Sequence, residues 1–562
     1  MRRTLTALTT VALAAGLGSY ATGAANATPE VAATPSTVAA PSAATAPVVP
    51  DATATQVHRY TPPPIRWGSC TSERLQQAGA ECGMLTVPMD YTRPTGTKIK
   101  LAVSRVKADP SVRYQGAMLV NPGGPGGSGL GLAVLGEFVP DSAGAGHDWI
   151  GFDPRGVGSS QPALTCDGNV TAAPRPYYTP FKSTIYTQWI NRSKDYANKC
   201  AKNGSILKHM RTSATVADME SLRRALGRHQ INLYGFSYGT YLGQMYASKY
   251  PNQVRRFVLD GVVDPRRVWY KANLDQNIAF EKSMRQFFNW VADNDASYGL
   301  GTDGQDVRAA WYKLRSKLYY NPQGKLGPSE FTDVFLSAGY YVYDWDYLAQ
   351  VFAAAQEGNF SPAEQTYVEG NPTGPGADNG YAVYAAVQCT DAIWPAKWST
   401  WREDAWQLNK SAPFETWGNT WFNAPCHWWP AQSQQDPYIN GSKAPAMLLI
   451  GETNDAATPF SGAIEVRRRF PKSVLIEGVG GSTHSGSLSG VACTDDKIAA
   501  YLKSGTLPTR RSGVLSDVKC APVPAPEPSV TAAARKSGQP TEKSVGIKNR
   551  ELRELLDGAR GF

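Results

Sequence analysis

Residues 231–239 read INLYGFSYG, and they predict both a local structure and a chemistry. The first four residues are mostly apolar and are typical of a buried strand, while a helix is predicted from Tyr238 to Tyr250, just before Pro251. Between them lies a Gly-x-Ser-x-Gly pentapeptide, whose glycines leave room for a serine on a tight strand-to-helix turn. A serine buried in an ordinary turn is the structural alternative. The context of strand, turn and helix makes Ser237 the candidate nucleophile.

The segments around this turn alternate between predicted strands and predicted helices. An amphipathic pattern from Ala214 to Leu226, followed by Gly227, predicts one of the helices. The other predicted strands are Ile99 to Val106, Ala117 to Asn121, Asp148 to Phe152, Arg256 to Leu259, Ala446 to Ile450 and Ser473 to Ile476. Several are continuous apolar runs, as in a sheet covered on both faces. The pattern predicts an α/β fold with a mostly parallel central sheet.

The alternation breaks after about Pro265, and a chain of 562 residues is too long for one core of ordinary size. Residues 266–443 are rich in Trp, Tyr and Phe, and they are far too numerous for a connecting loop. We expect them to form a large, mainly helical cap above the catalytic end of the sheet. Residues 57–265 and 444–521 would then form the two parts of the core.

Both ends of the chain are expected to lie outside this core. Residues 1–27 combine Arg2 and Arg3, a short apolar stretch and Ala25-Asn26-Ala27, the pattern of a secretory signal peptide. The apolar stretch is too short for a membrane anchor. Residues 28–56 have the composition of a disordered leader or propeptide, which would make the protein a zymogen, and residues 522–562 that of a flexible tail. We predict a secreted, extracellular protein.

The formal charge of +9 comes from scattered Lys and Arg residues, many beside Asp or Glu. The one dense run, residues 467–469, is interpreted as a solvated helix face, so nucleic acid is not an expected partner.

The eight cysteines fall into couples of near neighbours, which suits an exported protein with disulfides. The couples are Cys70 with Cys82, Cys166 with Cys200, Cys389 with Cys426, and Cys493 with Cys520. This pairing is one of about 105 possible ones. A metal site is the alternative, but the chain has no CxxC pair, and we expect no metal.

Chain order selects the partners of Ser237, because the acid and then the histidine follow the serine in α/β-hydrolases. Only His427 and His484 follow it, and His427 lies among tryptophans and precedes the best acid. His484, in a loop of small residues after the last predicted strand, is therefore the candidate base. Asp455, in the loop after the strand Ala446 to Ile450, is the candidate acid. The alternatives for the acid are Glu452, Asp260 and Asp264.

Attack on a carbonyl creates an oxyanion, which needs prearranged N–H donors. One is expected to be the backbone N–H of Tyr238, directly after the nucleophile. The other is expected from the glycine-rich loop at residues 121–129, NPGGPGGSG, with Gly124 as the first choice and Gly123 as the next. A phosphate-binding loop is the alternative, but no Gly-Lys-Ser/Thr follows.

These motifs together resemble the prolyl iminopeptidase branch of the α/β-hydrolases, and more closely the secreted bacterial tripeptidyl aminopeptidases with a TAP-like C-terminal region. The resemblance covers about residues 65 to 521. It rests on PGGPGG at 122–127, DPRGVGSS at 153–160, YGFSYGTYLG at 234–243, VLDGVVDP at 258–265, QCTD at 388–391, the loop at 455–459, and the stretch from Cys493 through Tyr501 to Cys520. One departure is Pro122, where the iminopeptidases usually have histidine before the glycines.

The resemblance implies a serine exopeptidase that removes short peptides, perhaps tripeptides, from free N-termini of peptides or proteins. Such an enzyme needs an anion that binds the substrate's α-ammonium group. Asp391 has the best motif support, although its neighbour Cys389 makes a structural role as reasonable. The other cap candidates are Glu330, Asp333, Asp344, Asp346, Glu357, Glu364 and Glu369.

Two alternatives remain: an esterase or lipase-like hydrolase of small acyl substrates, and a hydrolase-fold protein that only binds. No organic cofactor is implied, and the sequence leaves the oligomeric state open.

Overall fold

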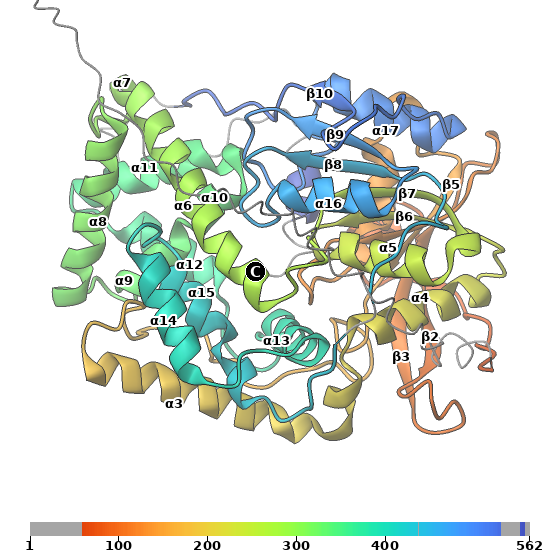
Figure 1. The fold of residues 1–562 in the computed structure, drawn as a ribbon, viewed down its shortest axis with the longest axis horizontal. Coiled ribbons are helices and arrows are strands. Elements are labelled where there is room, and N and C mark those ends of the chain that lie inside the picture. The colour runs from red at the N-terminus through yellow and green to blue at the C-terminus, as the bar shows by residue number, and fades with distance from the viewer. Residues whose placement is uncertain (1–58, 436–437, 530–550, 557–562) are drawn as a thin grey trace, which may run out of the picture. The chain divides into compact units, whose positions relative to one another are not determined.

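The structure is a computed structural model that describes residues 59–435, 438–529 and 551–556. The predicted signal peptide and leader lie outside these residues. At the centre is a ten-stranded sheet (Figure 1) with the order β1-β2-β3-β5-β4-β6-β7-β8-β9-β10. Its strands are β1 (Gly68–Ser69), β2 (Glu81–Pro88), β3 (Lys98–Val106), β4 (Gly116–Asn121), β5 (His147–Phe152), β6 (Ile231–Phe236), β7 (Val254–Asp260), β8 (Leu448–Glu452), β9 (Val474–Gly478) and β10 (Val518–Cys520).

The sheet is antiparallel at one edge and parallel elsewhere. The pairs β1–β2, β2–β3 and β3–β5 are antiparallel. From β5 to β10 every neighbouring pair is parallel. Every residue of β4 except its first is buried, as is the whole of β5 and β6. This agrees with the continuous apolar runs of the sequence and confirms the predicted α/β class with a mostly parallel sheet.

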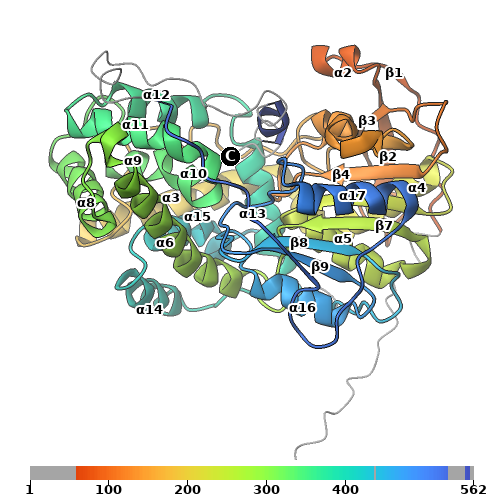
Figure 2. The same ribbon diagram turned by 90° about the horizontal axis from the view of Figure 1, so that it is seen from above.

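Helices cover both faces of the sheet. On one face α4 (Thr212–Ala225), α5 (Tyr238–Lys249) and α16 (Ser461–Arg469) pack against side chains such as Leu119 and Leu233. On the other face η1 (Leu130–Phe138) and α17 (Ala492–Ser504) pack against Met118 and Tyr234. Figure 2 shows α17 and α5 on opposite sides of the strands. Successive side chains along each strand point to opposite faces of the sheet, so each strand contributes to two separate apolar layers.

The cap is helical, as expected, and has its own core. Its helices are α6 (Tyr270–Asp293), α7 (Asp295–Tyr298), α8 (Gly304–Tyr320), α9 (Pro328–Val334), α10 (Leu336–Tyr340), α11 (Trp345–Gln356), α12 (Ser361–Gly370), α13 (Asn379–Asp391), α14 (Trp398–Asn409) and α15 (Thr416–Asn423). Phe287, Trp311 and Phe335 lie at the centre of their packing. The aromatic composition of the insertion therefore builds a second hydrophobic core.

The cap also includes a segment that the sequence analysis assigned to residues 57–265 of the core. Helix α3 (Ser183–Cys200) packs its Ile185 and Trp189 against Trp417 and Trp421 of α15. Figure 1 shows α3 running beside α14 and α15 instead of covering the sheet. The aromatic side chains of α3 are buried against aromatic side chains of the cap, and this burial accounts for the position of α3.

The predicted flexible tail, residues 522–562, is packed in part. The Val523 N–H donates to Glu452, and Ser529 donates to Asp346 of α11. Residues 551–556 are helical, with Leu552 and Leu556 buried against the sheet layer. Arg553 forms an ion pair with Asp344 at 3.0 Å. Apolar leucines spaced along a short charged helix supply the contacts that a flexible tail would lack.

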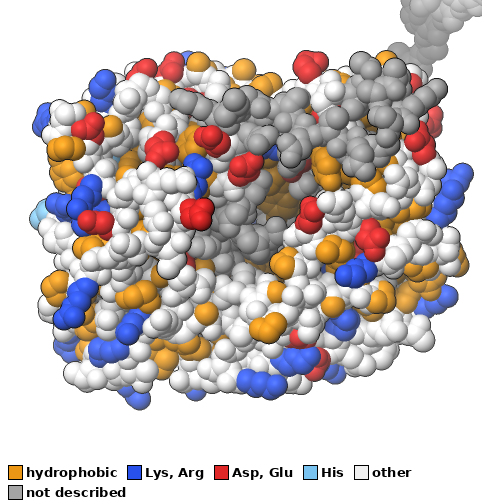
Figure 3. Space-filling view, turned by 180° about the vertical axis from the view of Figure 1, so that it is seen from behind, with side chains coloured by type: hydrophobic (Ala, Val, Ile, Leu, Met, Phe, Trp, Pro, Cys, Tyr) orange, Lys and Arg blue, Asp and Glu red, His pale blue; other side chains and the backbone are white. Residues whose placement is uncertain are grey.

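Four disulfides join the cysteines in the expected couples: Cys70–Cys82, Cys166–Cys200, Cys389–Cys426 and Cys493–Cys520. No helix in the described part of the chain is long and apolar enough to span a membrane. On the described part of the face seen in Figure 3, acidic and basic side chains are interspersed.

Candidate active site

Ser237 stands on a strained turn between β6 and α5. Its backbone has φ 53° and ψ −122°, a conformation that costs energy in any residue other than glycine. The turn is held by the Ser237 N–H, which donates to the Asp260 carbonyl at 2.9 Å. A Cβ at Gly235 would lie 2.6 Å from the Gly239 carbonyl oxygen, so the two glycines allow the turn to close.

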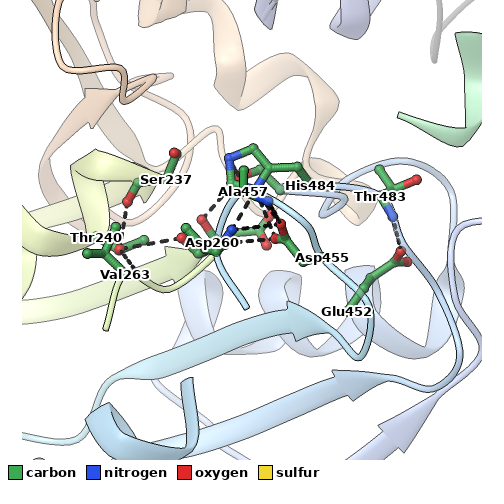
Figure 4. Close-up of polar contacts among 12 residues, drawn as sticks. Ser237, Thr240, Asp260, Val263, Glu452, Asp455, Ala457, Thr483 and His484 are labelled. Carbon is green, nitrogen blue, oxygen red and sulfur yellow. Dashed lines mark hydrogen bonds and ion pairs between the residues drawn. The ribbon is translucent and has the colours of Figure 1, made fainter. Parts of the chain in front are cut away.

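His484 and Asp455 form a buried hydrogen-bonded pair in the loops after β9 and β8 (Figure 4). His484 Nδ1 lies 2.8 Å from Asp455 Oδ2 and 3.0 Å from Oδ1. The carboxylate also accepts the N–H groups of Ala457 and Thr458 at 2.9 Å and the Thr458 hydroxyl at 2.8 Å. With its oxygens fixed in this way, Asp455 can orient the imidazole and stabilise its protonated form.

The loop of His484 is tied to both the core and the cap. The His484 N–H donates to the carbonyl of Tyr340 in α10 at 2.8 Å, and the two rings lie 5.8 Å apart. On the core side, the Ser485 hydroxyl donates to the Asp260 carbonyl, the acceptor that also holds Ser237. One carbonyl therefore connects the loop of the base to the turn of the nucleophile.

Ser237 and His484 line the same cavity. Among the described residues no hydrogen bond joins the Ser237 hydroxyl to the imidazole, and His484 Nε2 lies 3.5 Å from Ser485 Oγ. Hydrogen bonds of this kind are commonly long without substrate and tighten in the Michaelis complex. Serine and base thus face one cavity, in which the hydrogen bond between them can form when substrate binds.

The alternative acids and the alternative histidine have other partners. The Asp260 carboxylate accepts the Ser487 N–H, and burial raises its pKa to about 6. Glu452 accepts the N–H groups of Thr483 and Val523, and burial raises its pKa to about 8. Asp264 forms an ion pair with Arg266. His427 packs against Trp398 and Trp428. The structure brings only Asp455 to the His484 ring.

The glycine loop after β4 lies against the nucleophile turn, and Gly124 and Tyr238 both line the cavity beside Ser237. Gly123, the second choice, donates its N–H to Asn121 Oδ1 at 3.0 Å. The arrangement favours the backbone N–H groups of Gly124 and Tyr238 as the oxyanion donors.

Replacing Gly123 with alanine tests this arrangement. Gly123 has φ +99°, and a Cβ there would lie 2.8 Å from both the Phe236 carbonyl oxygen and Ser237 Cβ. These are rigid neighbours, so the loop must move away from the nucleophile, and we expect kcat to fall by about 10²-fold. The measurement is kcat on a peptide anilide and on an ester, beside Gly370→Ala, whose Cβ would meet no atom within 4 Å. Activity unchanged in Gly123→Ala would contradict the assigned loop.

Asp391, the proposed ammonium anchor, does not line the cavity, and this assignment is corrected. The Asp391 side chain is buried and accepts the Thr212 N–H at 2.8 Å, the Thr212 hydroxyl and the Trp269 indole N–H. Burial raises its pKa to about 6. Its oxygens hold the start of α4 to the end of α13, so they are not available to a substrate.

The cavity itself has a volume of about 920 Å³ and is lined by residues of both core and cap. Its walls are aromatic, with Trp269, Tyr340, Tyr384, Trp421 and Phe422 among the lining residues. Of the cap carboxylates that the sequence suggested, Asp333, Asp344 and Glu369 line it, whereas Glu330, Asp346, Glu357 and Glu364 do not. Glu415 also lines the cavity, although no sequence motif indicated a role for it. Within the described residues no cluster of three His, Cys, Asp or Glu side chains could hold a metal ion.

Comparisons with known proteins place the chain among hydrolases of the α/β-hydrolase fold. Residues 116–303 match the family model described as "alpha/beta hydrolase fold", and residues 412–520 match the one described as "TAP-like protein". The tripeptidyl aminopeptidase of Streptomyces lividans is 38% identical over 480 residues, which cover 83% of this chain and 88% of that protein. Serine protease Hip1 of Mycobacterium tuberculosis (strain H37Rv) is 28% identical over 478 residues, 79% of this chain and 90% of its own length. Carboxylesterase B of the same strain is 30% identical over 485 residues, which cover 82% and 90%.

Proposed function

Because the chain belongs to the tripeptidyl aminopeptidase family of α/β-hydrolases, we propose that this serine hydrolase is a secreted exopeptidase that releases tripeptides from free N-termini. The observation that carries the proposal is the position of Ser237. The candidate nucleophile opens onto a cavity of about 920 Å³ walled by the cap, which suits the end of a peptide better than the middle of a folded chain.

The site supports an acyl-enzyme mechanism. Ser237 Oγ attacks the scissile carbonyl carbon as His484 takes the hydroxyl proton, and Asp455 holds the imidazolium. The N–H groups of Gly124 and Tyr238 stabilise the oxyanion. When the tetrahedral intermediate collapses, the C–N bond breaks and His484 gives its proton to the leaving amine. Water then attacks the ester, with His484 again as base, and releases the short peptide.

Secretion is supported by two features. Residues 1–27 have the pattern of a signal peptide: basic residues, then an apolar stretch, and Ala25-Asn26-Ala27 at the end. The four disulfides suit an oxidising compartment.

A panel of chromogenic substrates tests the proposal. We expect p-nitroanilides of tripeptides with a free amino group to be cleaved at least about 10-fold faster, in kcat/KM, than their N-acetylated forms or than mono- and dipeptide anilides, since a lost charged hydrogen bond costs about that factor. Equal rates on free and acetylated tripeptides would refute the exopeptidase assignment.

An esterase of small acyl substrates is the second candidate, and the similarity to a protein named carboxylesterase B favours it. The same panel includes p-nitrophenyl acetate and butyrate. Rapid ester hydrolysis without cleavage of any peptide anilide would establish this alternative.

A further inference from the structure

Glu415 is a carboxyl group in the cavity wall that lacks a partner. It stands at the N-cap position of α15, yet its side chain makes no capping hydrogen bond. Its Oε2 is buried, and no hydrogen bond or ion pair within the described residues engages the side chain. Glu415 as a whole is partly exposed, but a buried carboxylate oxygen without a partner still carries a desolvation cost.

The other carboxyl groups that line the cavity already have partners. These pairs are Asp264 with Arg266, Asp275 with Arg267, Asp333 with Arg175 and Tyr178, Asp344 with Arg553, Asp378 with the Asp167 N–H and Tyr196, and exposed Glu369 with Gln365. Glu415 is therefore the carboxyl group of the cavity, among the described residues, for which no hydrogen bond or ion pair is present.

The surroundings of Glu415 favour an incoming positive charge. Burial, with the nearby charge of Asp333 adding to it, raises the pKa of Glu415 to about 8. The guanidinium groups that line the cavity are engaged elsewhere, as Arg267 is with Asp275. Arg175 binds Glu330 and Asp333, and Arg192 donates to the Val170 carbonyl. A bound cation would offset the electrostatic cost of ionising this carboxyl group.

Glu415 lines the same cavity as the candidate nucleophile Ser237 and the candidate base His484. Tyr340 contacts the His484 ring edge-on, with the centroids 5.8 Å apart. Burial raises the Tyr340 pKa, and the charge of Glu415 is the next cause of that rise. Tyr340 thus contacts the candidate base and lies within the electrostatic influence of Glu415. Tyr384, another wall residue, shares the same electrostatic influence of Glu415 and offers an aromatic face to a cation.

We propose that Glu415 binds the α-ammonium group of the substrate, in the cavity that Ser237 also lines. The inference rests on the proposed exopeptidase function. A protonated amine has three N–H donors and a positive charge, so it satisfies the carboxylate directly. Extension of the substrate beyond this amine would place an uncharged amide against Glu415 and leave the carboxylate without a compensating positive charge.

The test is Glu415→Gln, which keeps the shape of the side chain and removes its charge. We expect kcat/KM for free tripeptide anilides to fall by about 10- to 100-fold, the worth of a hydrogen bond to a charged group. Three control rates should change by less than about 2-fold: kcat/KM for N-acetylated tripeptide anilides, kcat/KM for p-nitrophenyl butyrate, and the rate of Ser237 labelling by a fluorophosphonate. None of these reagents has an α-ammonium group that Glu415 could bind.

Two further variants sharpen the result. Glu369→Gln removes an exposed carboxylate of the same cavity and should leave all rates unchanged. Glu415→Asp keeps the charge and should retain part of the preference for free amines.

The outcomes separate the inference from the proposed function. Wild-type preference for free amines that survives in Glu415→Gln overturns the role of Glu415 alone. A wild-type enzyme that hydrolyses only esters overturns both. Parallel loss of ester hydrolysis and of labelling in Glu415→Gln would show that Glu415 supports the cavity and does not bind substrate, which also overturns the inference.

Discussion

Replacing Ser237 with alanine is expected to lower kcat by about 10⁴- to 10⁶-fold on peptide and ester substrates alike, because no other group can form the acyl-enzyme. The residual rate should come from the oxyanion donors and from substrate binding. Fluorophosphonate labelling should disappear, and circular dichroism should be unchanged, since the methyl group fits wherever the serine side chain fits.

Ser461 supplies the matched control. It lines the same cavity at the first position of α16 and is exposed. Ser461→Ala should keep the wild-type kcat and the wild-type labelling rate. Labelling that persists in Ser237→Ala would show that a different nucleophile reacts.

Replacing Asp455 with asparagine is expected to lower kcat by about 10⁴-fold. Asp455 accepts a hydrogen bond from His484 Nδ1, which leaves Nε2 free of its proton and able to act as a base. In Asp455→Asn the amide oxygen would remain bonded to the N–H groups of Ala457 and Thr458, so the amide NH2 would face Nδ1. The imidazole would then carry its proton on Nε2, and it could not accept the proton of Ser237.

The measurement is kcat on a tripeptide anilide across pH, with Asp264→Asn as the control. Asp264 lines the cavity but is paired with Arg266, so its variant should stay within about 3-fold of wild type, as for most surface charge pairs. If Asp455→Asn keeps more than a tenth of the wild-type rate, a different acid orients His484, and Asp260 is the nearest one to test.

The part of the site that the sequence predicts is the part governed by local rules. The turn at Ser237 requires glycine at positions 235 and 239, and both glycines are part of the pentapeptide motif that can be recognised in the sequence. Chain order then narrows the histidine and the acid to the loops after β9 and β8, where the structure brings His484 and Asp455 together. The mostly parallel sheet follows in the same way from the apolar runs of its strands.

The ammonium anchor could not be predicted, because it depends on contacts between remote segments. Asp391 continues the spacing of Tyr384 and Gln388, which do line the cavity, but Thr212 at the start of α4 takes its oxygens. Glu415 carries no motif. The one unusual feature in its local sequence is a charged residue between two buried ones, Phe414 and Thr416. Whether its carboxyl group has a hydrogen-bonding or ionic partner depends on how α15 packs on α6 and α3, which the local sequence does not specify.

The position of α3 was missed for a similar reason. The segment lies between β5 and α4, where a sheet-covering helix is the usual element, and its place in the chain suggested the core. Its aromatic residues, Trp189 among them, match those of α15, and burial of aromatic surface outweighs proximity in sequence.

The hydrogen bond from the His484 N–H to the Tyr340 carbonyl has a consequence for engineering. The loop that carries the candidate base rests on α10, so the cap is a structural part of the catalytic centre and cannot be treated as an interchangeable module. A chimaera that exchanges caps between relatives to alter specificity must keep the backbone of α10 in register with the His484 loop. Specificity is therefore better redesigned by substitutions on α13 and α15, which border the cavity without supporting the histidine.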